Sequence, residues 1–335
     1  MKEQLNLAKA NLKKDGFLNL QLDPSLDIIS EIKRLKSEKN AVILAHYYQV
    51  PEIQDIADYV GDSLGLSQMA AKTSADIIVF AGVHFMAETA KILNPNKKVL
   101  LPDLNAGCSL AESCSGEDLK NFRKQYPDHL VVTYINTSAD VKVYSDIVCT
   151  SSNAEKIINS IPKDQKIIFA PDKNLGKYIM EQTGRDMVLW DGSCVVHEAF
   201  SLDKIVALYN EHPGAKIIAH PESESHILRV AAYVGSTAGM IDFVKKDKGK
   251  KYIVATEAGI LHKMQQDVPN KELIAAPAKE DNTCACSECA FMRLNTLKKL
   301  YLCLKYELPE IVVDPEISEK ALRPIQRMME ISERK

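Results

Sequence analysis

One pattern occurs three times in this 335-residue sequence: a short apolar run ends in polar side chains and is followed by helix-like segments. The apolar runs cover residues 42–45, 130–133 and 216–219, and each is followed by a second and a third run further along the chain. Apolar runs that alternate with amphipathic helices are typical of parallel α/β units. The pattern therefore predicts an α/β fold of three pseudo-symmetric repeats, each a small parallel-sheet, Rossmann-like domain, around a central active site.

The repeats also predict domain boundaries. We expect a helical lead-in over residues 1–40, α/β repeats over 41–128, 129–214 and 215–300, and a helical segment over 301–335. Within the lead-in, Asp23 followed by Pro24 predicts a helix that is capped by the aspartate and starts at the proline. At the end of the third repeat, the sequence predicts an apolar helix that begins near Ala290.

Composition argues against two classes of function. The net charge of −3 and the isoelectric point near 6.3 argue against a nucleic-acid-binding protein. No apolar run approaches the roughly 18 residues that are needed to cross a membrane, and the first residues lack the apolar core of a signal peptide. We therefore expect a cytoplasmic protein that binds neither nucleic acid nor membranes and whose thiols stay reduced.

Polar side chains follow the first predicted strand of every repeat. They are His46, Tyr48, Tyr134, Asn136, His220 and Glu222. His46, Asn136 and His220 are 90 and 84 residues apart, which suggests equivalent positions. A histidine at a strand end is more often structural than catalytic, but loops after the carboxyl ends of parallel strands form the binding edge of such sheets. We therefore predict that Tyr48 and Glu222 act as acid or base, and that His220 moves protons or binds an oxyanion.

A second set of polar residues stands where helices are expected to start. Ser63, Ser151 and Ser236 are 88 and 85 residues apart, and Thr237 follows the last of them. A single serine at such a place is usually an N-cap. Three helix N-termini that face one cavity would suit a substrate with several carboxylates or a phosphate, so we favour anion binding at these places.

Three of the eight cysteines, Cys284, Cys286 and Cys289, lie in one polar loop. Alone, this loop is consistent with a metal site, a redox switch or chance, because its spacing matches neither a structural zinc site nor a bacterial ferredoxin run. The repeats select Cys289, because Cys108 and Cys194 occupy the corresponding loops after the third strand and are 86 residues apart. We expect one thiolate from each repeat to converge on a single point.

Three such thiolates can hold three corners of a [4Fe–4S] cluster, although zinc and copper(I) also accept these ligands. Three ligands leave one metal position open, and an open iron acts as a Lewis acid on a substrate oxygen. We expect His197 to support the metal loop, with an exposed loop residue as the alternative. We expect Cys149 and Cys303 to be packing residues and Cys114 to be a bystander.

Further motifs connect these residues over most of the chain. They are 45–48, 54–58, 61–64, 85–89, 107–111, 134–137, 149–154, 194–198, 220–222, 235–237, and Cys289 before Phe291 and Met292. In this order, from about residue 40 to residue 300, they resemble the quinolinate synthase family, the A proteins of de novo NAD biosynthesis.

The resemblance implies a transferase that condenses iminoaspartate with dihydroxyacetone phosphate to quinolinate, phosphate and water. It implies an oxygen-sensitive [4Fe–4S] cluster on Cys108, Cys194 and Cys289, with the fourth iron facing the substrate. The residues that it implies in the substrate pocket are His46, Ser63, Tyr134, Asn136, Ser151, His220, Glu222 and Thr237. Tyr48 and Glu222 would carry the proton transfers. A transient partner that oxidises L-aspartate would supply the iminoaspartate.

The last cysteine loop departs from that family's pattern. Many relatives have Cys-x2-Cys-x2-Cys there, and a proline where Ala290 stands in this chain. Because a disulfide between Cys284 and Cys286 would be strained, we expect no redox switch in this loop.

Three rival functions stay open. A structural or electron-transfer iron–sulfur protein would need a fourth cysteine ligand. A non-enzymatic small-molecule binding protein with three α/β lobes would need no metal. Another [4Fe–4S]-dependent lyase of the dehydratase type would differ in its substrate.

Overall fold

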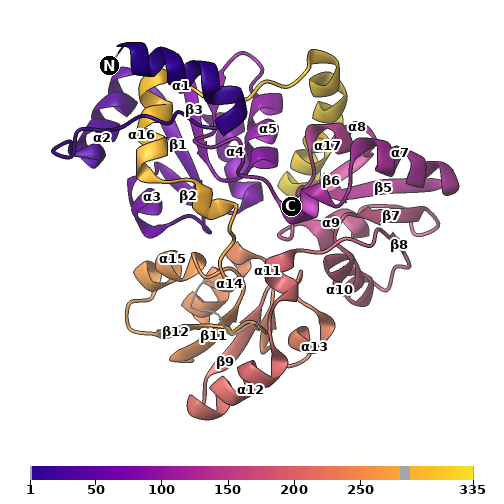
Figure 1. Cartoon of the computed structure of the whole chain (residues 1–335). Coiled ribbons are helices and arrows are strands. Elements are labelled where there is room, and N and C mark those ends of the chain that lie inside the picture. Colours follow the sequence, from indigo (N-terminus) through magenta and orange to yellow (C-terminus); the bar gives the residue numbers. More distant parts are fainter. Residues whose placement is uncertain (1, 280–286, 335) are drawn as a thin grey trace. The chain divides into compact units, whose positions relative to one another are not determined.

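Three four-stranded parallel sheets are present in this computed structural model, which describes residues 2–279 and 287–334 (Figure 1). The strands are β1 (Ala41–His46), β2 (Tyr59–Gly61), β3 (Ile77–Ala81) and β4 (Lys98–Leu100); β5 (His129–Tyr134), β6 (Ile147–Cys149), β7 (Lys166–Ala170) and β8 (Val188–Leu189); and β9 (Lys216–Ala219), β10 (Tyr233–Val234), β11 (Lys251–Ala255) and β12 (Glu272–Ala275). In every sheet the second strand is at one edge, followed by the first, third and fourth. The predicted α/β fold of three parallel-sheet repeats is confirmed.

Helices connect the strands and flank the sheets (Figure 1). In the first repeat they are α3 (Pro51–Ile56), α4 (Ser63–Lys72) and α5 (His84–Leu93). Between the first and second sheets lie α6 (Ser109–Glu112) and α7 (Gly116–Gln125), and the second repeat contains α8 (Ala139–Val143), α9 (Ala154–Asn159) and α10 (Lys173–Thr183). Between the second and third sheets lie α11 (Val195–Glu198) and α12 (Leu202–Glu211), and the third repeat contains α13 (Ser225–Leu228), α14 (Thr237–Lys246) and α15 (Ile260–Asp267). Outside the repeats lie α1 (Lys2–Asp15), α2 (Ile28–Glu38), the 3₁₀-helix η1 (Met292–Leu294), α16 (Leu297–Tyr306) and α17 (Pro315–Glu333).

The same backbone hydrogen bond recurs before the second strand of each repeat and fixes which residues are equivalent. It runs from Asp58 N to Ile43 O (2.9 Å), from Asp146 N to Val131 O (2.9 Å) and from Ala232 N to Ile217 O (2.7 Å). The acceptors are 88 and 86 residues apart, and these offsets carry over to the rest of the first-strand loops.

These offsets correct one prediction. The position that closes or follows the first strand is occupied by His46, Tyr134 and His220, and the position two residues later by Tyr48, Asn136 and Glu222. Asn136 is therefore the counterpart of Tyr48 and not of His46. All six predicted strand-end residues thus occupy two positions that are repeated three times.

Each repeat has one strand more than the pattern of apolar runs predicts, namely the short edge strand β2, β6 or β10. In the first and third repeats, a glycine near this edge strand makes room for a tyrosine ring. A Cβ at Gly61 would lie 2.6 Å from the Tyr59 ring, and one at Gly235 would lie 2.5 Å from the Tyr233 hydroxyl oxygen. The residue type at these positions is therefore set by the close approach of the ring.

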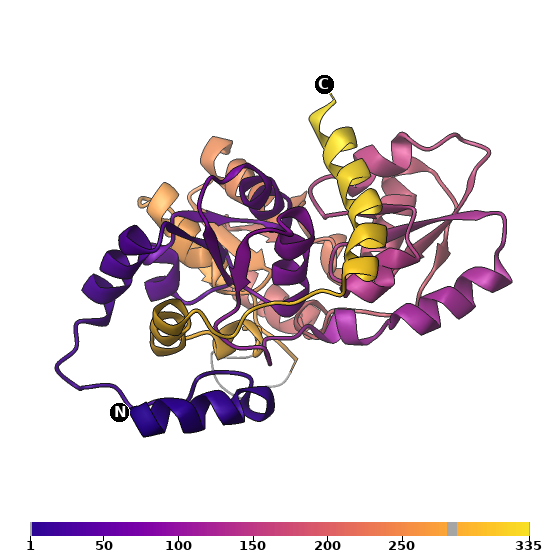
Figure 2. The same ribbon diagram turned by 90° about the horizontal axis from the view of Figure 1, so that it is seen from above.

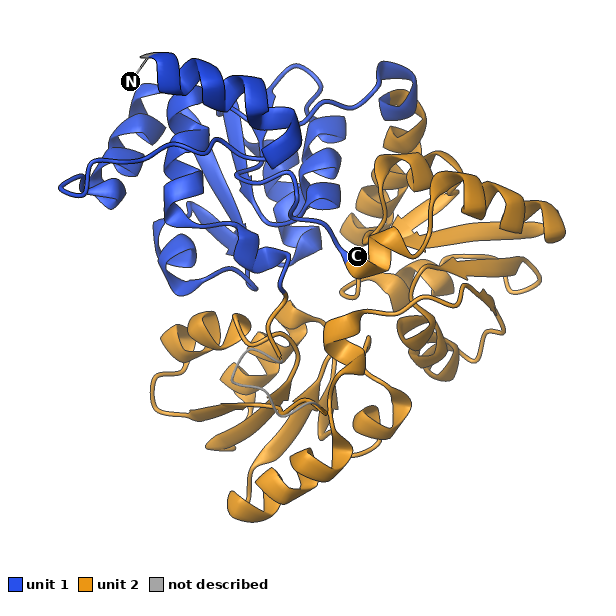
Figure 3. Cartoon of the chain, viewed as in Figure 1, with its two compact units in different colours: residues 1–108, 290–318 blue, residues 109–289, 319–335 orange. Residues whose placement is uncertain are grey.

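The chain divides into two compact units (Figure 3). Unit 1 comprises residues 1–108 and 290–318 and contains the first repeat. Unit 2 comprises residues 109–289 and 319–335 and contains the second and third repeats. Contacts between the second and third repeats therefore belong to one compact unit.

In unit 1, helices α1, α2 and α16 pack on one face of the first sheet. Alternate buried residues of β1 and β3 form one core with apolar side chains of α1, α2 and α16. Asp27 caps α2 by accepting from Ser30 N at 3.1 Å, whereas Asp23 accepts from Ser25 N in a local turn. The predicted cap at Asp23 is therefore wrong.

The segment after the third repeat also differs from its prediction. The regular helix α16 starts at Leu297, where Thr296 accepts a hydrogen bond from Lys299 N at 3.2 Å, and not near Ala290. Helix α17 lies along the second repeat (Figure 2), and its Ser332 hydroxyl accepts a hydrogen bond from Asn153 Nδ2 at 2.8 Å. Among the described residues, every helix is too short or too polar to cross a lipid bilayer.

Candidate functional site

Side chains of the second and third repeats meet at the carboxyl ends of their first strands. The Tyr134 hydroxyl, at the end of β5, donates to Glu222 Oε1 at 2.5 Å. His220 Nε2 lies 3.1 Å from Ser151 Oγ. Four of the predicted site residues, Tyr134, Ser151, His220 and Glu222, are therefore brought together in unit 2 by direct hydrogen bonds.

Glu222 is at the centre of this group. Its carboxyl group is buried, with Oε2 3.2 Å from His197 Nδ1 and Oε1 3.6 Å from His220 Nδ1. Burial alone would raise the pKa of Glu222, but the charges of His197 and His220 and the hydrogen bonds from His197 and Tyr134 outweigh it and lower this pKa. The group is therefore a carboxylate that can accept a proton from a bound molecule.

His197 is buried and is not an exposed loop residue. It lies on α11, three residues after Cys194, and its Nε2 is 2.9 Å from Thr256 Oγ1. The ring centroids of His197 and His220 are 4.8 Å apart. One ligand atom each from Cys194, His197 and Glu222 lies within 4.8 Å of the others, so this group can hold a metal ion.

A second buried carboxyl group lies close to Glu222 and was not predicted. Asp172 Oδ1 accepts from Leu175 N at 2.8 Å and caps α10, while Oδ2 has no hydrogen-bond partner among residues 2–279 and 287–334. Burial, together with the negative charge of Glu222, raises the pKa of Asp172 well above its ordinary value. The local sequence of Asp172 resembles an ordinary helix cap, so only its burial distinguishes it.

The histidines at the ends of the first strands in the first and third repeats make the same local contact. His46 Nδ1 accepts from Tyr48 N at 3.2 Å, and His220 Nδ1 accepts from Glu222 N at 3.4 Å. In a ring that is neutral and accepts this bond at Nδ1, the proton is on Nε2. In unit 1 the His46 and Tyr48 rings also pack edge to face, with centroids 4.5 Å apart.

Asn136 differs from the other strand-end residues because its side-chain oxygen is unused. Asn136 Oδ1 is buried and has no hydrogen-bond partner among the described residues. A buried acceptor of this kind costs free energy unless something binds it. This is the arrangement expected of a residue that contacts a ligand.

The helix starts exclude the N-cap alternative at two of the three serines and bear it out at the third. Asp62 caps α4 by accepting from Gly65 N at 2.8 Å, so Ser63 is the first helical residue. Ser151 precedes Asn153, after which α9 begins. Ser236 does cap α14, accepting from Gly239 N at 3.1 Å. By the repeat offsets, Ser63 and Ser151 correspond to Thr237.

The cysteines fall into two groups. Cys108, Cys194 and Cys289 are partly exposed, whereas Cys114, Cys149 and Cys303 are buried. Burial raises the pKa of Cys114 to about 12 and also raises the pKa values of Cys149 and Cys303. The three partly exposed thiols are the ones predicted as ligands, and their chemistry suits an iron–sulfur cluster. Cys284 and Cys286 lie outside the described residues.

Glu257 holds the backbone of the last predicted ligand. Its buried carboxylate accepts from Cys289 N at 3.1 Å through Oε1 and from Gly259 N at 2.7 Å through Oε2. Ala258 N donates to Ser287 O at 2.9 Å in the same place. The loop after β11 therefore fixes Cys289 within unit 2.

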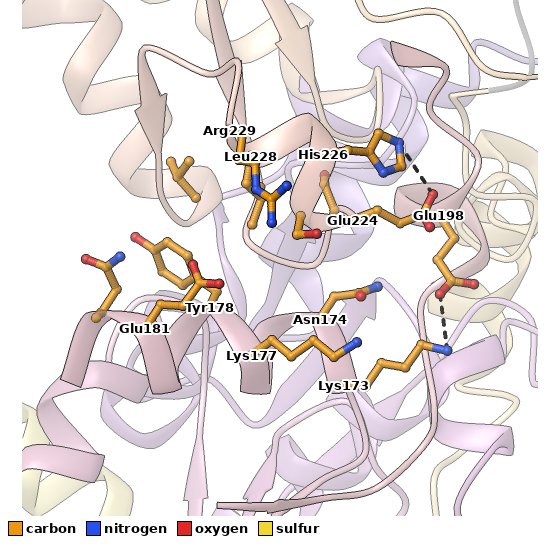
Figure 4. A pocket seen from close by; sticks show the side chains of 14 residues that line it. Lys173, Asn174, Lys177, Tyr178, Glu181, Glu198, Glu224, His226, Leu228 and Arg229 are labelled. Carbon is orange, nitrogen blue, oxygen red and sulfur yellow. Dashed lines mark ion pairs between the residues drawn. The ribbon is translucent and has the colours of Figure 1, made fainter. Parts of the chain in front are cut away.

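A cleft of about 440 Å³ lies between α10 and the segment around α13 (Figure 4). Lys177 and Arg229 reach into it from these two sides, with the ion pairs Lys173–Glu198 (3.6 Å) and Glu224–His226 (3.8 Å) at one end. None of the predicted site residues lines it, although Ser223, the neighbour of Glu222, does.

Comparison with known proteins connects this site to a family. The family model described as Quinolinate synthetase A protein matches residues 30–330. A quinolinate synthase of Microcystis aeruginosa is 63% identical over 306 residues, which are 91% of this chain and 95% of that protein. The quinolinate synthases of Gloeothece citriformis and Nostoc punctiforme are each 63% identical, over 91% and 92% of this chain and 94% of their own lengths.

Proposed function

Because the chain belongs to the quinolinate synthetase A protein family, as its motifs predict, we propose that it forms quinolinate from iminoaspartate and dihydroxyacetone phosphate. The atoms balance when phosphate and two molecules of water leave, so the reaction needs no oxidant or reductant. The observation that supports this most directly is the buried Glu222 carboxylate, held by Tyr134, His197 and His220.

We assign the iron–sulfur ligands to Cys108, Cys194 and Cys289. Support comes from their partial exposure, which the other three described cysteines lack, and from the tether between Glu257 and Cys289. When bound, a [4Fe–4S] cluster with three cysteine ligands supplies a Lewis acid at its remaining iron. The same residues argue against a structural cluster, which would take a fourth thiolate.

The protein side chains bind the substrates and move protons in this proposal. Glu222, which its lowered pKa keeps ionised, accepts a proton, and Tyr48 is the second acid or base. His220 exchanges protons with Glu222 or binds an oxyanion. The residues that line the substrate pocket are His46, Ser63, Tyr134, Asn136, Ser151 and Thr237. The buried Asn136 Oδ1, which has no hydrogen-bond partner among the described residues, can accept a hydrogen bond from an N–H or O–H group of a substrate.

The chemistry of iminoaspartate suggests a partner. An imine of this kind hydrolyses in water, so an enzyme that oxidises L-aspartate would have to supply it close to the site. We infer a transient association with such an enzyme in the cytoplasm, where thiol ligands stay reduced.

The test is an assay of anaerobically purified, iron-replete protein with oxaloacetate, ammonia and dihydroxyacetone phosphate, with quinolinate measured by mass spectrometry. We expect quinolinate from the wild type and from Cys114→Ala, and none from Cys108→Ala. Absence of product from iron-replete wild type would overturn the proposal. Turnover of a different hydroxy acid in its place would favour the rival lyase.

A further inference from the structure

The amino group of Lys142 makes hydrogen bonds in the protein interior. It lies on α8 and is fully buried. Its Nζ donates to Ile135 O at 3.1 Å, to Thr137 O and to Thr137 Oγ1 at 3.3 Å. The amino group therefore ties together two carbonyl groups on either side of Asn136.

The first repeat has the same pair of hydrogen bonds to carbonyl groups, made by a different residue. Gln54, on α3, donates from Nε2 to Tyr47 O at 3.0 Å and to Gln49 O at 2.8 Å. Each of these positions is 88 residues before its counterpart in the second repeat, which is the offset set by the sheet register. The residue between the two carbonyl groups is Tyr48 in the first repeat and Asn136 in the second.

We propose that Lys142 and Gln54 are positioning residues that fix the loops carrying Asn136 and Tyr48. This inference rests on the proposed function, in which those two side chains contact substrate. We call Lys142 and Gln54, with the two carbonyl groups that each binds, clamps. Neither clamp touches substrate; each acts by holding the backbone on both sides of a residue that does. A misplacement of about 1 Å at such a residue can cost about 10²-fold in rate.

The third repeat lacks this clamp. By the 86-residue offset the corresponding position is Leu228, whose side chain has no hydrogen-bond donor. Ser223 Oγ in the loop is buried and has no hydrogen-bond partner among the described residues. Instead the loop is held from the second repeat, where Asn174 Nδ2 donates to Glu222 O at 3.2 Å and Tyr134 donates to the Glu222 carboxylate. Lys142 therefore holds a loop on which the Glu222 loop also depends.

The test exchanges residues among the repeats. Lys142→Gln installs the residue of the first repeat and Lys142→Leu that of the third. We expect Lys142→Leu to lower kcat/KM for quinolinate formation about 10²-fold, mainly through kcat, with iron content unchanged. Lys142→Gln should lose less than about tenfold. Amide hydrogen exchange at residues 135–137 should be faster in the leucine variant than in the glutamine variant.

Wild-type kinetics and exchange in folded Lys142→Leu would overturn the proposal, as would equal losses in the two variants. If Lys142→Leu does not fold, Gln54→Leu makes the matched test in the first repeat. Exchange at 135–137 reports on the clamp even if the wild type forms no quinolinate. Absence of quinolinate from the wild type would refute the proposed function, and the hydrogen-exchange rates would still test whether Lys142 holds the loop.

Discussion

The first-strand loops of the second and third repeats are built from the same fold but are held in different ways. The 134–137 loop is held from within its repeat by Lys142. The 220–223 loop is held largely from outside its repeat, by Tyr134, Ser151 and Asn174. The difference indicates that the 134–137 loop serves as a scaffold and that Glu222, the proposed proton acceptor, is positioned upon it.

This comparison predicts a gradient of effects. A change at the Glu222 carboxylate should cost most, and changes in the contacts that hold it should cost less. A change at the Ser223 hydroxyl, which has no hydrogen-bond partner among the described residues, should cost least. Four substitutions follow this order.

The largest effect is expected for Glu222→Gln. The amide keeps an oxygen for the Tyr134 hydroxyl but accepts no proton, so kcat should fall by about 10²–10⁴-fold. Steady-state assays at matched iron content measure this. A variant that keeps wild-type kcat would show that another group accepts the proton.

Tyr134→Phe removes the hydrogen bond between the two loops and keeps the ring. A hydrogen bond to a charged group is worth about 1.5–3 kcal/mol, so kcat/KM should fall roughly 10- to 10²-fold. Tyr134 helps to lower the pKa of Glu222, so its loss should raise that pKa. The carboxylate is then protonated at higher pH, and the acid limb of the pH profile should move upward. If the acid limb of the pH profile does not move, Tyr134 does not lower the pKa of Glu222.

Asn174→Ala removes the contact with the Glu222 backbone. A neutral hydrogen bond contributes about 0.5–1.5 kcal/mol, so we expect a loss of about two- to tenfold in kcat/KM. Ser332→Ala, which removes a hydrogen bond of α17, is the control and should leave activity unchanged. Equal losses in both would point to general destabilisation.

Ser223→Ala is expected to have the smallest effect. Its hydroxyl is buried and has no hydrogen-bond partner within residues 2–279 and 287–334, so its removal should leave thermal stability unchanged or raise the free energy of unfolding by up to about 1 kcal/mol. Thermal denaturation measures this. A clear loss of stability would mean that this hydroxyl is bound in the folded protein.

The sequence predicts the fold well because alternating apolar runs and their threefold repetition are local patterns. It also indicates Tyr134, His220 and Glu222, because polar residues at strand ends stand out. It misplaces Asn136 by two positions, because equivalence depends on hydrogen bonds between strands. It gives no sign of Lys142 or Asp172, because a lysine on a short helix and an aspartate at a helix start look exposed until the fold buries them.

The most direct test is a crystal structure of anaerobically prepared, iron-replete protein with quinolinate bound. The account predicts quinolinate in contact with Asn136 and with the Tyr134 hydroxyl, and iron on Cys108, Cys194 and Cys289. Quinolinate bound in the cleft of Lys177 and Arg229, with Asn136 Oδ1 unused, would contradict it.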